Sequence, residues 1–419
     1  MSSRPRPLAG SAICRTYPTE STTAVYDPKV TDRSPFLLDP DVVFLNHGSF
    51  GATPQPVFDE YQRLQRAMER QPVEWLQRRI DGLMATARES LASYIGCAAD
   101  EVVYFPNPTT AIAMVARSLS LQRGDEVLTT DHEYGAMDRT WRVICATADA
   151  RYIRVPIPLP VISVADTVER VWAGVTERTR VLFISHITSA TAMRFPVEEL
   201  VRRARAAGLI TIVDGAHVPG HLPLDVASVG ADIYTGACHK WMCAPKGSSF
   251  VHVRRDAQHW LRPLVISWGW EAIAPSGSTF IDHHEWQGTR DLSAFLATPP
   301  AIEWMASCDW PVVQQRCHQL VDHARRRVDA LTGLDSVYPE ESFQWFGQMA
   351  VVRLPDVDVA VLKRRLYDEF RVETPVYRFN DQPLLRISIA AYNTAADVDA
   401  LVDALTTLLL QLAGSPSSA

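Results

Sequence analysis

The chain has 419 residues, which is enough for two or three domains of ordinary size around a large buried core. Hydrophobic residues make up 47% and charged residues 21%, as in ordinary globular proteins, and 41 Lys plus Arg against 48 Asp plus Glu give a net charge of -7. Because binding to a phosphate backbone requires a basic surface, this balance argues against nucleic acid as a partner. A charge interrupts every long apolar stretch, which argues against a membrane span.

The amino-terminal segment and the cysteines bear on where the protein works. Residues 1–35 are rich in Pro, Ser, Thr and Arg, which predicts an irregular arm, and no apolar region follows the first arginines as it would in a secretory signal. The seven cysteines form no CxxC pair, a pattern that favours reduced thiols over disulfides or a zinc site. We therefore expect a cytoplasmic protein without a metal centre.

Hydrophobic periodicity divides the rest of the chain into two regions. Apolar residues recur every three or four positions from Val57 to Leu91, which predicts a helix. Short apolar runs then alternate with helical segments such as 197–207, and these runs cover 101–105, 125–130, 180–186 and 209–217. The alternation predicts a mostly parallel sheet covered by helices on both faces.

After about residue 301 the pattern changes to helices, one of them over 312–331, and to strands over 349–354 and 384–390. A closing helix is predicted from Thr394 to about Gly414. We therefore expect an α/β protein whose large domain spans 61–300 and whose smaller α+β domain combines 36–60 with 301–419.

Ligands of α/β sheets bind beyond the carboxyl ends of the strands. Thr109 and Thr110 follow one predicted strand at a helix start, where backbone amides either need caps or hold a phosphate. His132 and Tyr134 follow another, and a tyrosine there either stacks on a planar ring or packs in the core. The sequence contains neither a GxG spacing nor a GxxxxGK[ST] loop, which argues against a nucleotide cofactor.

Two further strand ends carry Asp214 and Lys240. Asp214 precedes a glycine, and an Asp-Gly pair is equally typical of a plain turn. In the functional alternative, a buried carboxylate at this position lies beside a ring nitrogen and keeps that nitrogen protonated. Most lysines are solvated charges, but one among apolar and cationic neighbours, as Lys240 is beside His239 and Trp241, becomes an amine nucleophile. A phosphate cradle, a ring stacker, a carboxylate and an imine-forming lysine are what pyridoxal 5'-phosphate (PLP) requires.

The chain also resembles the fold-type I PLP enzymes of the class V aminotransferase group, and within it the isopenicillin N epimerase-like branch, which includes lincosamide-pathway enzymes that process cysteine S-conjugates. The resemblance extends over nearly the whole chain, and it rests on LLDPDVVFLNHGSFGATP (37–54), DHEYGAM, SHITSAT, VDGAHVPG, CHKWMCAPKG, WQGTRD and LLRISIAAYNT. It implies an aspartate aminotransferase-like fold, with a mostly parallel large-domain sheet and a smaller α+β domain.

The resemblance also implies a role for each matching residue. Lys240 would hold the cofactor as a Schiff base, Asp214 would pair with the ring nitrogen, and Arg386 would bind the substrate carboxylate in a bidentate pair. Strand alternation places Arg386 opposite Leu385 and Ile387, although an exposed arginine would give the same pattern. The other implied contacts are ring stacking by Tyr134, with His132 the weaker candidate; hydrogen bonds to the ring hydroxyl from Ser189 and His217; phosphate contacts from Thr109, Thr110 and His239; a contact from Thr289 to the phosphate of a neighbouring subunit, hence a homodimer with shared active sites; and a substrate opening lined by Asn46 and His47.

We therefore expect an enzyme of secondary metabolism, in antibiotic biosynthesis, that acts at Cα of an amino acid. Processing of a cysteine S-conjugate, by carbon–sulfur β-elimination or decarboxylative deamination, is the first hypothesis. Epimerisation is the alternative, with His47 and Tyr377 as candidates for the acid opposite Lys240, and a catalytically inactive binding protein is the second alternative. A persulfide-forming desulfurase is not expected, since residues 338–385 contain no cysteine.

Overall fold

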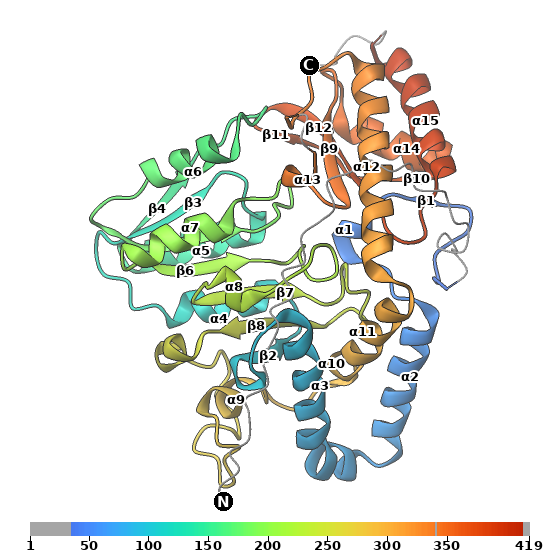
Figure 1. The fold of residues 1–419 in the computed structure, drawn as a ribbon. Helices are drawn as coiled ribbons and strands as arrows, with labels where there is room; N and C mark the ends of the chain where they lie inside the picture. The colour runs from blue at the N-terminus through green and yellow to red at the C-terminus, as the bar shows by residue number, and fades with distance from the viewer. Residues whose placement is uncertain (1–34, 340–341, 414–419) are drawn as a thin grey trace, which may run out of the picture.

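Seven strands form the central sheet, in the order β2-β8-β7-β6-β5-β3-β4 (Figure 1). The computed structural model describes residues 35–339 and 342–413. The strands are β2 (Val102–Phe105), β3 (Glu126–Thr130), β4 (Arg151–Val155), β5 (Thr179–Ser185), β6 (Ile210–Asp214), β7 (Ile233–Ala237) and β8 (Ser249–Val253). β8 runs antiparallel to β2 and β7, and the other pairs are parallel. The predicted mostly parallel sheet is therefore confirmed.

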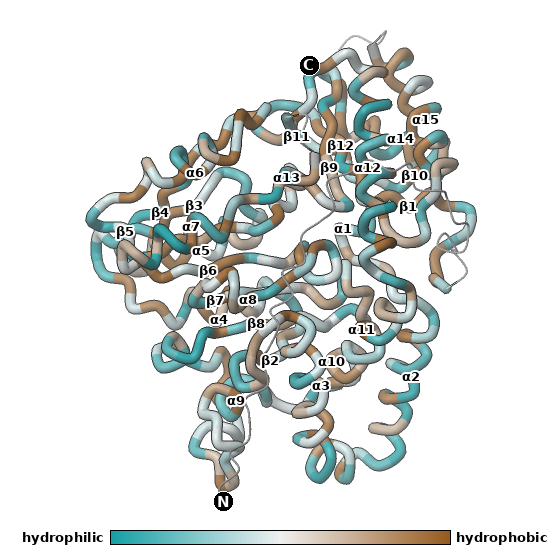
Figure 2. Tube along the Cα trace, viewed as in Figure 1, coloured by the Kyte–Doolittle hydropathy of each residue, from teal (hydrophilic) through white to brown (hydrophobic). Residues whose placement is uncertain are grey.

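Apart from the edge strand β4, the strands are buried on both faces, because alternate side chains enter two different cores. Val103 and Val181 pack with α4 (Pro108–Ser118) and α5 (Gly135–Thr147). Tyr104 and Leu182 point the other way, into the core shared with the helices α3 (Ile80–Ile95), α6 (Val164–Ala173), α7 (Val197–Ala206) and α8 (Val226–Val229). Figure 2 shows hydrophilic colour along the outward sides of the covering helices.

The helix predicted over 57–91 is in fact interrupted. α2 (Gln55–Arg70) ends just before Pro72, and a π-helical turn over Glu74–Arg79 leads into α3. Proline lacks an N–H group and disfavours helix in the residue before it, so a break at this position follows from the sequence. A short helix, α1 (His47–Phe50), precedes α2.

The small domain is built on two short sheets. β11 (Val376–Phe379), β12 (Gln382–Ser388) and β9 (Met349–Arg353) are antiparallel in this order, and β1 (Val43–Phe44) pairs in parallel with β10 (Val372–Glu373). Their helices, gathered at the upper right of Figure 1, are α12 (Trp310–Thr332), α13 (Ser342–Trp345), α14 (Val359–Phe370) and α15 (Ala395–Ala413). The domains are joined by α9 (Thr279–His284), α10 (Ser293–Leu296) and α11 (Thr298–Ser307).

The expected domain boundary between residues 60 and 61 falls inside the continuous helix α2, which packs on α10 and α11. The expected arm over 1–35 lies outside the described residues except for Pro35. Among the described residues, no helix has the length and apolar character needed to cross a membrane, and no group of three or more His, Cys, Asp or Glu side chains has the arrangement of a metal site.

Candidate active site

The carboxyl ends of five parallel strands meet at one edge of the sheet. The chain leaves β2 towards Thr109, β3 towards Tyr134, β5 towards Ser189, β6 at Asp214 and β7 towards Lys240. Thr109, Tyr134, Asp214 and Lys240 were each predicted to follow a strand, whereas Ser189 was implied only by the resemblance. The sheet order now places the ends of β7, β6, β5 and β3 side by side, with β2 beyond β8. This edge faces the small domain, whose Arg386 on β12 donates a hydrogen bond to Ser189 O at 2.8 Å.

Lys240 lies partly buried at the centre of this edge. Its Nζ is 3.1 Å from Nε2 of His217. Burial lowers the pKa of Lys240 to about 8; the carboxylate of Asp214 opposes this shift and the charge of Arg386 adds to it. A substantial fraction of Lys240 is therefore the nucleophilic amine near neutral pH.

Asp214 is almost completely buried at the end of β6. Its Oδ1 accepts a hydrogen bond from the backbone N–H of Ala216 at 3.0 Å, the contact expected of a turn residue. Burial raises the pKa of this carboxyl group, and the charge of Lys240 works in the opposite direction. A buried carboxylate gains most from a cationic partner, which is the situation a protonated ring nitrogen would provide.

His217 stands between Lys240 and the indole of Trp241. The Trp241 Nε1–H donates to Nδ1 of His217 at 3.3 Å, and burial with several cationic neighbours holds the pKa of His217 well below its usual range. The backbone carbonyl of His217 accepts a hydrogen bond from Nδ1 of His221 at 2.8 Å. His217 is therefore a neutral imidazole held at both its ring and its backbone.

His47 lies behind Lys240. Its Nε2 donates to the backbone carbonyl of Lys240 at 3.0 Å, and its Nδ1 lies 3.0 Å from the hydroxyl of Tyr392. With both ring nitrogens bonded and the side chain buried, His47 supports the Lys240 backbone and does not line an opening. Gly51 completes this support, because a Cβ on its left-handed backbone (φ 69°) would lie 2.0 Å from the carbonyl oxygen of His239.

Arg386 is buried on β12, which excludes the interpretation of an exposed strand arginine. Its Nη2 donates to Ser49 Oγ at 2.8 Å and to Asn46 Oδ1 at 3.4 Å, whereas its buried Nε has no hydrogen-bond partner among the described residues. Burial lowers the pKa of Arg386, and Tyr377 and Tyr134 oppose that shift. Asn46 thus holds the guanidinium in place, which leaves N–H donors for an anion.

The two candidate ring-stacking residues after β3 differ in their exposure to solvent. Tyr134 has 47% of its surface exposed, whereas His132 is fully buried, with hydrogen bonds to Thr191 Oγ1 at 2.6 Å and Ile157 O at 2.8 Å. Tyr134 is therefore the residue of this pair that has a ring face available.

The start of α4 holds the predicted phosphate-binding threonines. Asn107 caps this helix, and its Oδ1 accepts from Thr110 N at 2.8 Å and Thr110 Oγ1 at 3.0 Å, while Thr109 stays half-buried. On the β7 side, His239 donates its Nδ1–H to Ser248 O at 2.9 Å. Asn107 was not among the predicted site residues, although asparagine before a proline-initiated helix is a strong capping signal.

Comparison with known proteins agrees with this geometry. The profile of the family described as "Aminotransferase class-V" matches residues 43–401. The chain belongs to the class-V aminotransferase family. This class-V chain is 38% identical to the isopenicillin N epimerase of Amycolatopsis lactamdurans, over 90% of this chain and 97% of that protein. It is 36% identical to the isopenicillin N epimerase of Streptomyces clavuligerus, over 90% and 97%. It is 30% identical to "Putative L-cysteine desulfhydrase 1" of Oryza sativa subsp. japonica, over 88% and 83%.

Solved structures share the fold of this class-V enzyme. The cysteine desulfurase CsdA of Escherichia coli superposes with a TM-score of 0.77 at 21% identity, covering 93% of this chain and all of CsdA. The cystine C–S lyase C-DES superposes with a TM-score of 0.75 at 18% identity, covering 88% and 98%. Both likenesses confirm the expected fold-type I architecture.

The class-V family implies PLP as cofactor, and the site fits it. Lys240 offers a partly deprotonated amine, Asp214 a buried carboxylate that no guanidinium of the described residues pairs with, and Tyr134 a partly exposed ring. The buried Nε of Arg386 has no partner among the described residues, which suits a site that receives an anionic ligand. Retention of all these groups argues against a binding protein that has lost catalysis.

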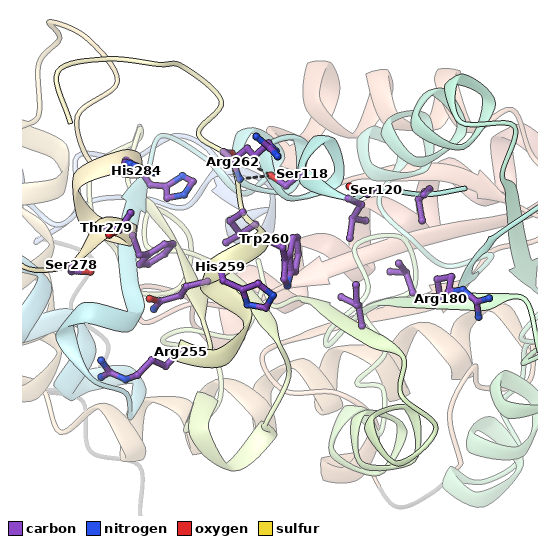
Figure 3. Close-up of a pocket in the computed structure, with 18 of the residues that line it drawn as sticks. Ser118, Ser120, Arg180, Arg255, His259, Trp260, Arg262, Ser278, Thr279 and His284 are labelled. Atoms are coloured by element: carbon purple, nitrogen blue, oxygen red, sulfur yellow. Dashed lines mark hydrogen bonds between the residues drawn. The ribbon is translucent and has the colours of Figure 1, made fainter. Parts of the chain in front are cut away.

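The aromatic segment after β8 does not line this edge. Trp260, Trp270 and Phe280 border a cavity of about 1020 Å³ next to Arg180 and Asp125, at the amino ends of the parallel strands (Figure 3). Thr289 is exposed and borders another cavity, of about 890 Å³, with Trp268 and Trp286. None of the residues lining either cavity belongs to the cluster around Lys240, so in a single chain Thr289 lies apart from it.

Glu133 is a second residue at this edge that was not among the predicted site residues. It is buried, and its Oε2 accepts from both the backbone N–H and the hydroxyl of Ser185, at 3.0 and 2.6 Å. Ser185 pairs with Asp214 across β5 and β6, and burial raises the pKa of Glu133 to about 7. Two buried carboxyl groups, those of Glu133 after β3 and Asp214 on β6, therefore lie on either side of the end of β5.

Proposed function

We propose that this class-V enzyme is a PLP-dependent amino-acid epimerase, which removes the Cα proton and returns it on the other face. The observation that carries the proposal is the position of Lys240 at the carboxyl edge of the sheet, where its Nζ lies 3.1 Å from Nε2 of His217; burial there also lowers the pKa of Lys240 to about 8. The two relatives called isopenicillin N epimerase, which align over 90% of the chain, support this choice of reaction.

Each residue of the cluster has a physical task in this proposal. Arg386 binds the substrate carboxylate through its free N–H groups and thereby fixes the orientation of Cα. Lys240, once free of the cofactor, takes the Cα proton because part of it is unprotonated near neutral pH. Asp214 stabilises a protonated ring nitrogen, and bound PLP supplies the sink for the Cα electrons. Ser189 and His217 bind the ring hydroxyl, and Thr109, Thr110 and His239 the phosphate.

The second acid is the point at which an epimerase differs from a lyase. His47 has both nitrogens bonded behind Lys240, and Tyr377 donates its hydroxyl to Ala190 O while burial raises its pKa to about 12. Tyr134 follows β3, whereas Lys240 follows β7, and β6 lies between these two strands in the sheet. The side chain of Tyr134 is exposed. We assign the proton donor on the second face to Tyr134.

Carbon–sulfur cleavage of a cysteine S-conjugate is the second candidate function. The relative called a putative L-cysteine desulfhydrase favours it, and both reactions begin with loss of the same Cα proton. Persulfide transfer is not part of this candidate, because residues 338–385 contain no cysteine.

Incubation of candidate amino acids with the holoenzyme in heavy water tests the proposal. Epimerisation predicts Cα-deuterated substrate of inverted configuration, without release of thiol, pyruvate or carbon dioxide. Tyr134→Phe should stop inversion while still allowing Cα exchange with retention, because Lys240 still serves one face. Release of thiol with pyruvate would establish the lyase candidate instead, and carbon dioxide with ammonia would establish decarboxylative deamination.

We further propose that two copies share each active site through Thr289. Its exposure and its distance from the cluster in one chain support a contact with a second copy. Mixing Lys240→Ala chains with Thr289→Ala chains tests this idea, because a mixed dimer would contain one site that keeps both residues. Activity of the mixture no higher than that of either variant alone would contradict sharing.

A further inference from the structure

The tautomer of His217 follows from its hydrogen bonds. An indole N–H is only a donor, so Nδ1 of His217, 3.3 Å from Trp241 Nε1, must be the unprotonated nitrogen. A neutral imidazole carries one hydrogen, which therefore sits on Nε2. That nitrogen is 3.1 Å from Nζ of Lys240. The Nε2–H group must donate to Lys240, and only an uncharged amine has the lone pair to accept.

The same bonds make protonation of either partner costly. An ammonium at Lys240 would direct N–H groups at an N–H group, and a cationic imidazole would direct a second N–H at the indole. The other charged groups facing Lys240 are Asp214 from the end of β6, which favours the ammonium, and Arg386 from β12, which opposes it. The imidazole therefore adds to the effect of Arg386 and of burial.

The indole that fixes this tautomer is itself rigidly packed. Its ring contacts those of His221, at 4.2 Å between centroids, and His47, at 4.9 Å. A Cβ on Gly220 would lie 2.3 Å from the carbonyl oxygen of Trp241, so only glycine permits the loop after His217 to approach this closely. His221 closes the arrangement, because its Nδ1–H donates to His217 O and its Nε2 accepts from Gln348 N. The indole of Trp241 is thus buried between two histidine rings, with its N–H directed at His217.

We propose that Trp241 is a positioning residue that holds His217 as the Nε2–H tautomer and thereby favours the free-amine form of Lys240 over its ammonium form. The inference deepens the proposed function, since it rests on Lys240 being the reactive amine, but the arrangement is a property of the chain without cofactor or substrate. With phenylalanine in place of Trp241, Nδ1 loses its donor. His217 then gains access to the Nδ1–H tautomer, whose bare Nε2 accepts a hydrogen bond from the ammonium form of Lys240.

Titration of Lys240 by NMR tests the proposal directly. The chain has four lysines, Lys29, Lys240, Lys246 and Lys363, so carbon-13 labelling of lysine gives few side-chain signals, and loss of one signal in Lys240→Arg assigns it. Trp241→Phe should raise the titration midpoint of Lys240 by about one pH unit, a roughly tenfold loss of amine near neutral pH. Exposed Lys363 is the internal reference.

Trp141→Phe is the matched control. Trp141 is equally buried, but its Nε1 has no hydrogen-bond partner among the described residues, so the same substitution there removes a buried indole without touching His217. It should leave the Lys240 midpoint unchanged. An equal shift in both variants, or none in Trp241→Phe, would overturn the proposal.

Nitrogen-15 spectra of the unmutated full chain give a second test that does not depend on the variant folding. Pyrrole-type and pyridine-type imidazole nitrogens differ widely in chemical shift, and His217→Gln assigns the signals. The proposal requires a protonated Nε2 and a bare Nδ1 in the cofactor-free chain; the opposite tautomer would refute it. Neither measurement uses substrate, so a failed epimerase assay and a failed tautomer assignment are separate outcomes.

Discussion

Truncation of Arg386 tests whether this guanidinium is the anchor of the substrate carboxylate. Two of its nitrogens are held by Ser189, Ser49 and Asn46, and Nε has no partner among the described residues, so the side chain is fixed before a ligand arrives. Each hydrogen bond between charged partners contributes about 1.5–3 kcal/mol, so loss of a bidentate pair should cost at least about 3 kcal/mol. This corresponds to a roughly 150-fold weaker binding of substrate.

The assay is a spectral titration of holoenzyme with amino-acid substrate, which gives the Kd, together with steady-state kcat and KM. Arg386→Ala should raise Kd by the amount above, and Arg386→Lys should recover part of the loss, since an ammonium keeps the charge but not the planar fork. Ser49→Ala is the control, because it removes one support at 2.8 Å and leaves the guanidinium, for a change of about fivefold. A Kd for Arg386→Ala within about threefold of the unmutated enzyme, with PLP still bound, would refute the assignment.

Three further predictions follow from the buried groups. The rate at which PLP enters the cofactor-free chain, measured by stopped-flow absorbance, should rise with pH up to about 8, where the Lys240 amine becomes the major form; a flat profile would contradict the lowered pKa. Asp214→Asn should retain PLP in gel filtration but lose at least about 100-fold in kcat, about 2.7 kcal/mol, because an amide cannot hold the ring nitrogen protonated. Burial raises the pKa of Glu133 from its ordinary value of 4.5 to about 7, so the folded state keeps a proton that the unfolded state loses between these values, and stability should fall as pH rises through this window. In Glu133→Gln, a Tm measured from pH 4 to 8 should lack that part of the fall, and an unchanged profile would show that Glu133 is not its source.

The elements that could be predicted from the sequence are those whose pattern is local. The runs ending at Ser185 and Asp214 are β-branched and continuous, so they predicted strands, and the residues after them faced the carboxyl edge as expected. The interruption at Pro72 could have been predicted, because proline restricts the backbone of the residue before it. Hydrophobic periodicity alone predicted one continuous helix. β4 and β8 were missed since neither is followed by a residue that the chemistry singles out.

The contacts that support the site could not be read in this way, because they join residues far apart in sequence. His47 meets the Lys240 backbone across 193 positions, and Arg386 meets Asn46 across 340. Asn46 and His47 were predicted to line a substrate opening because they share one motif, whereas the tertiary structure uses His47 to support the Lys240 backbone and Asn46 to hold the Arg386 guanidinium.

The reactive amine and the carboxylate anchor belong to different sheets, so their separation depends on how the domains pack. Lys240 follows β7 of the large sheet, whereas Arg386 lies on β12 of the small one. The hydrogen-bonded connections between the domains include three near the site: Tyr392 to His47 and on to the Lys240 carbonyl, Gln348 to His221 and on to the His217 carbonyl, and Arg386 to Ser189. Two of these connections end on the backbone carbonyls of Lys240 and His217. A shift of the small domain would therefore move Lys240 together with Arg386. The stereochemical control that an epimerase needs at Cα therefore depends on the packing between domains as much as on the residues that touch the substrate.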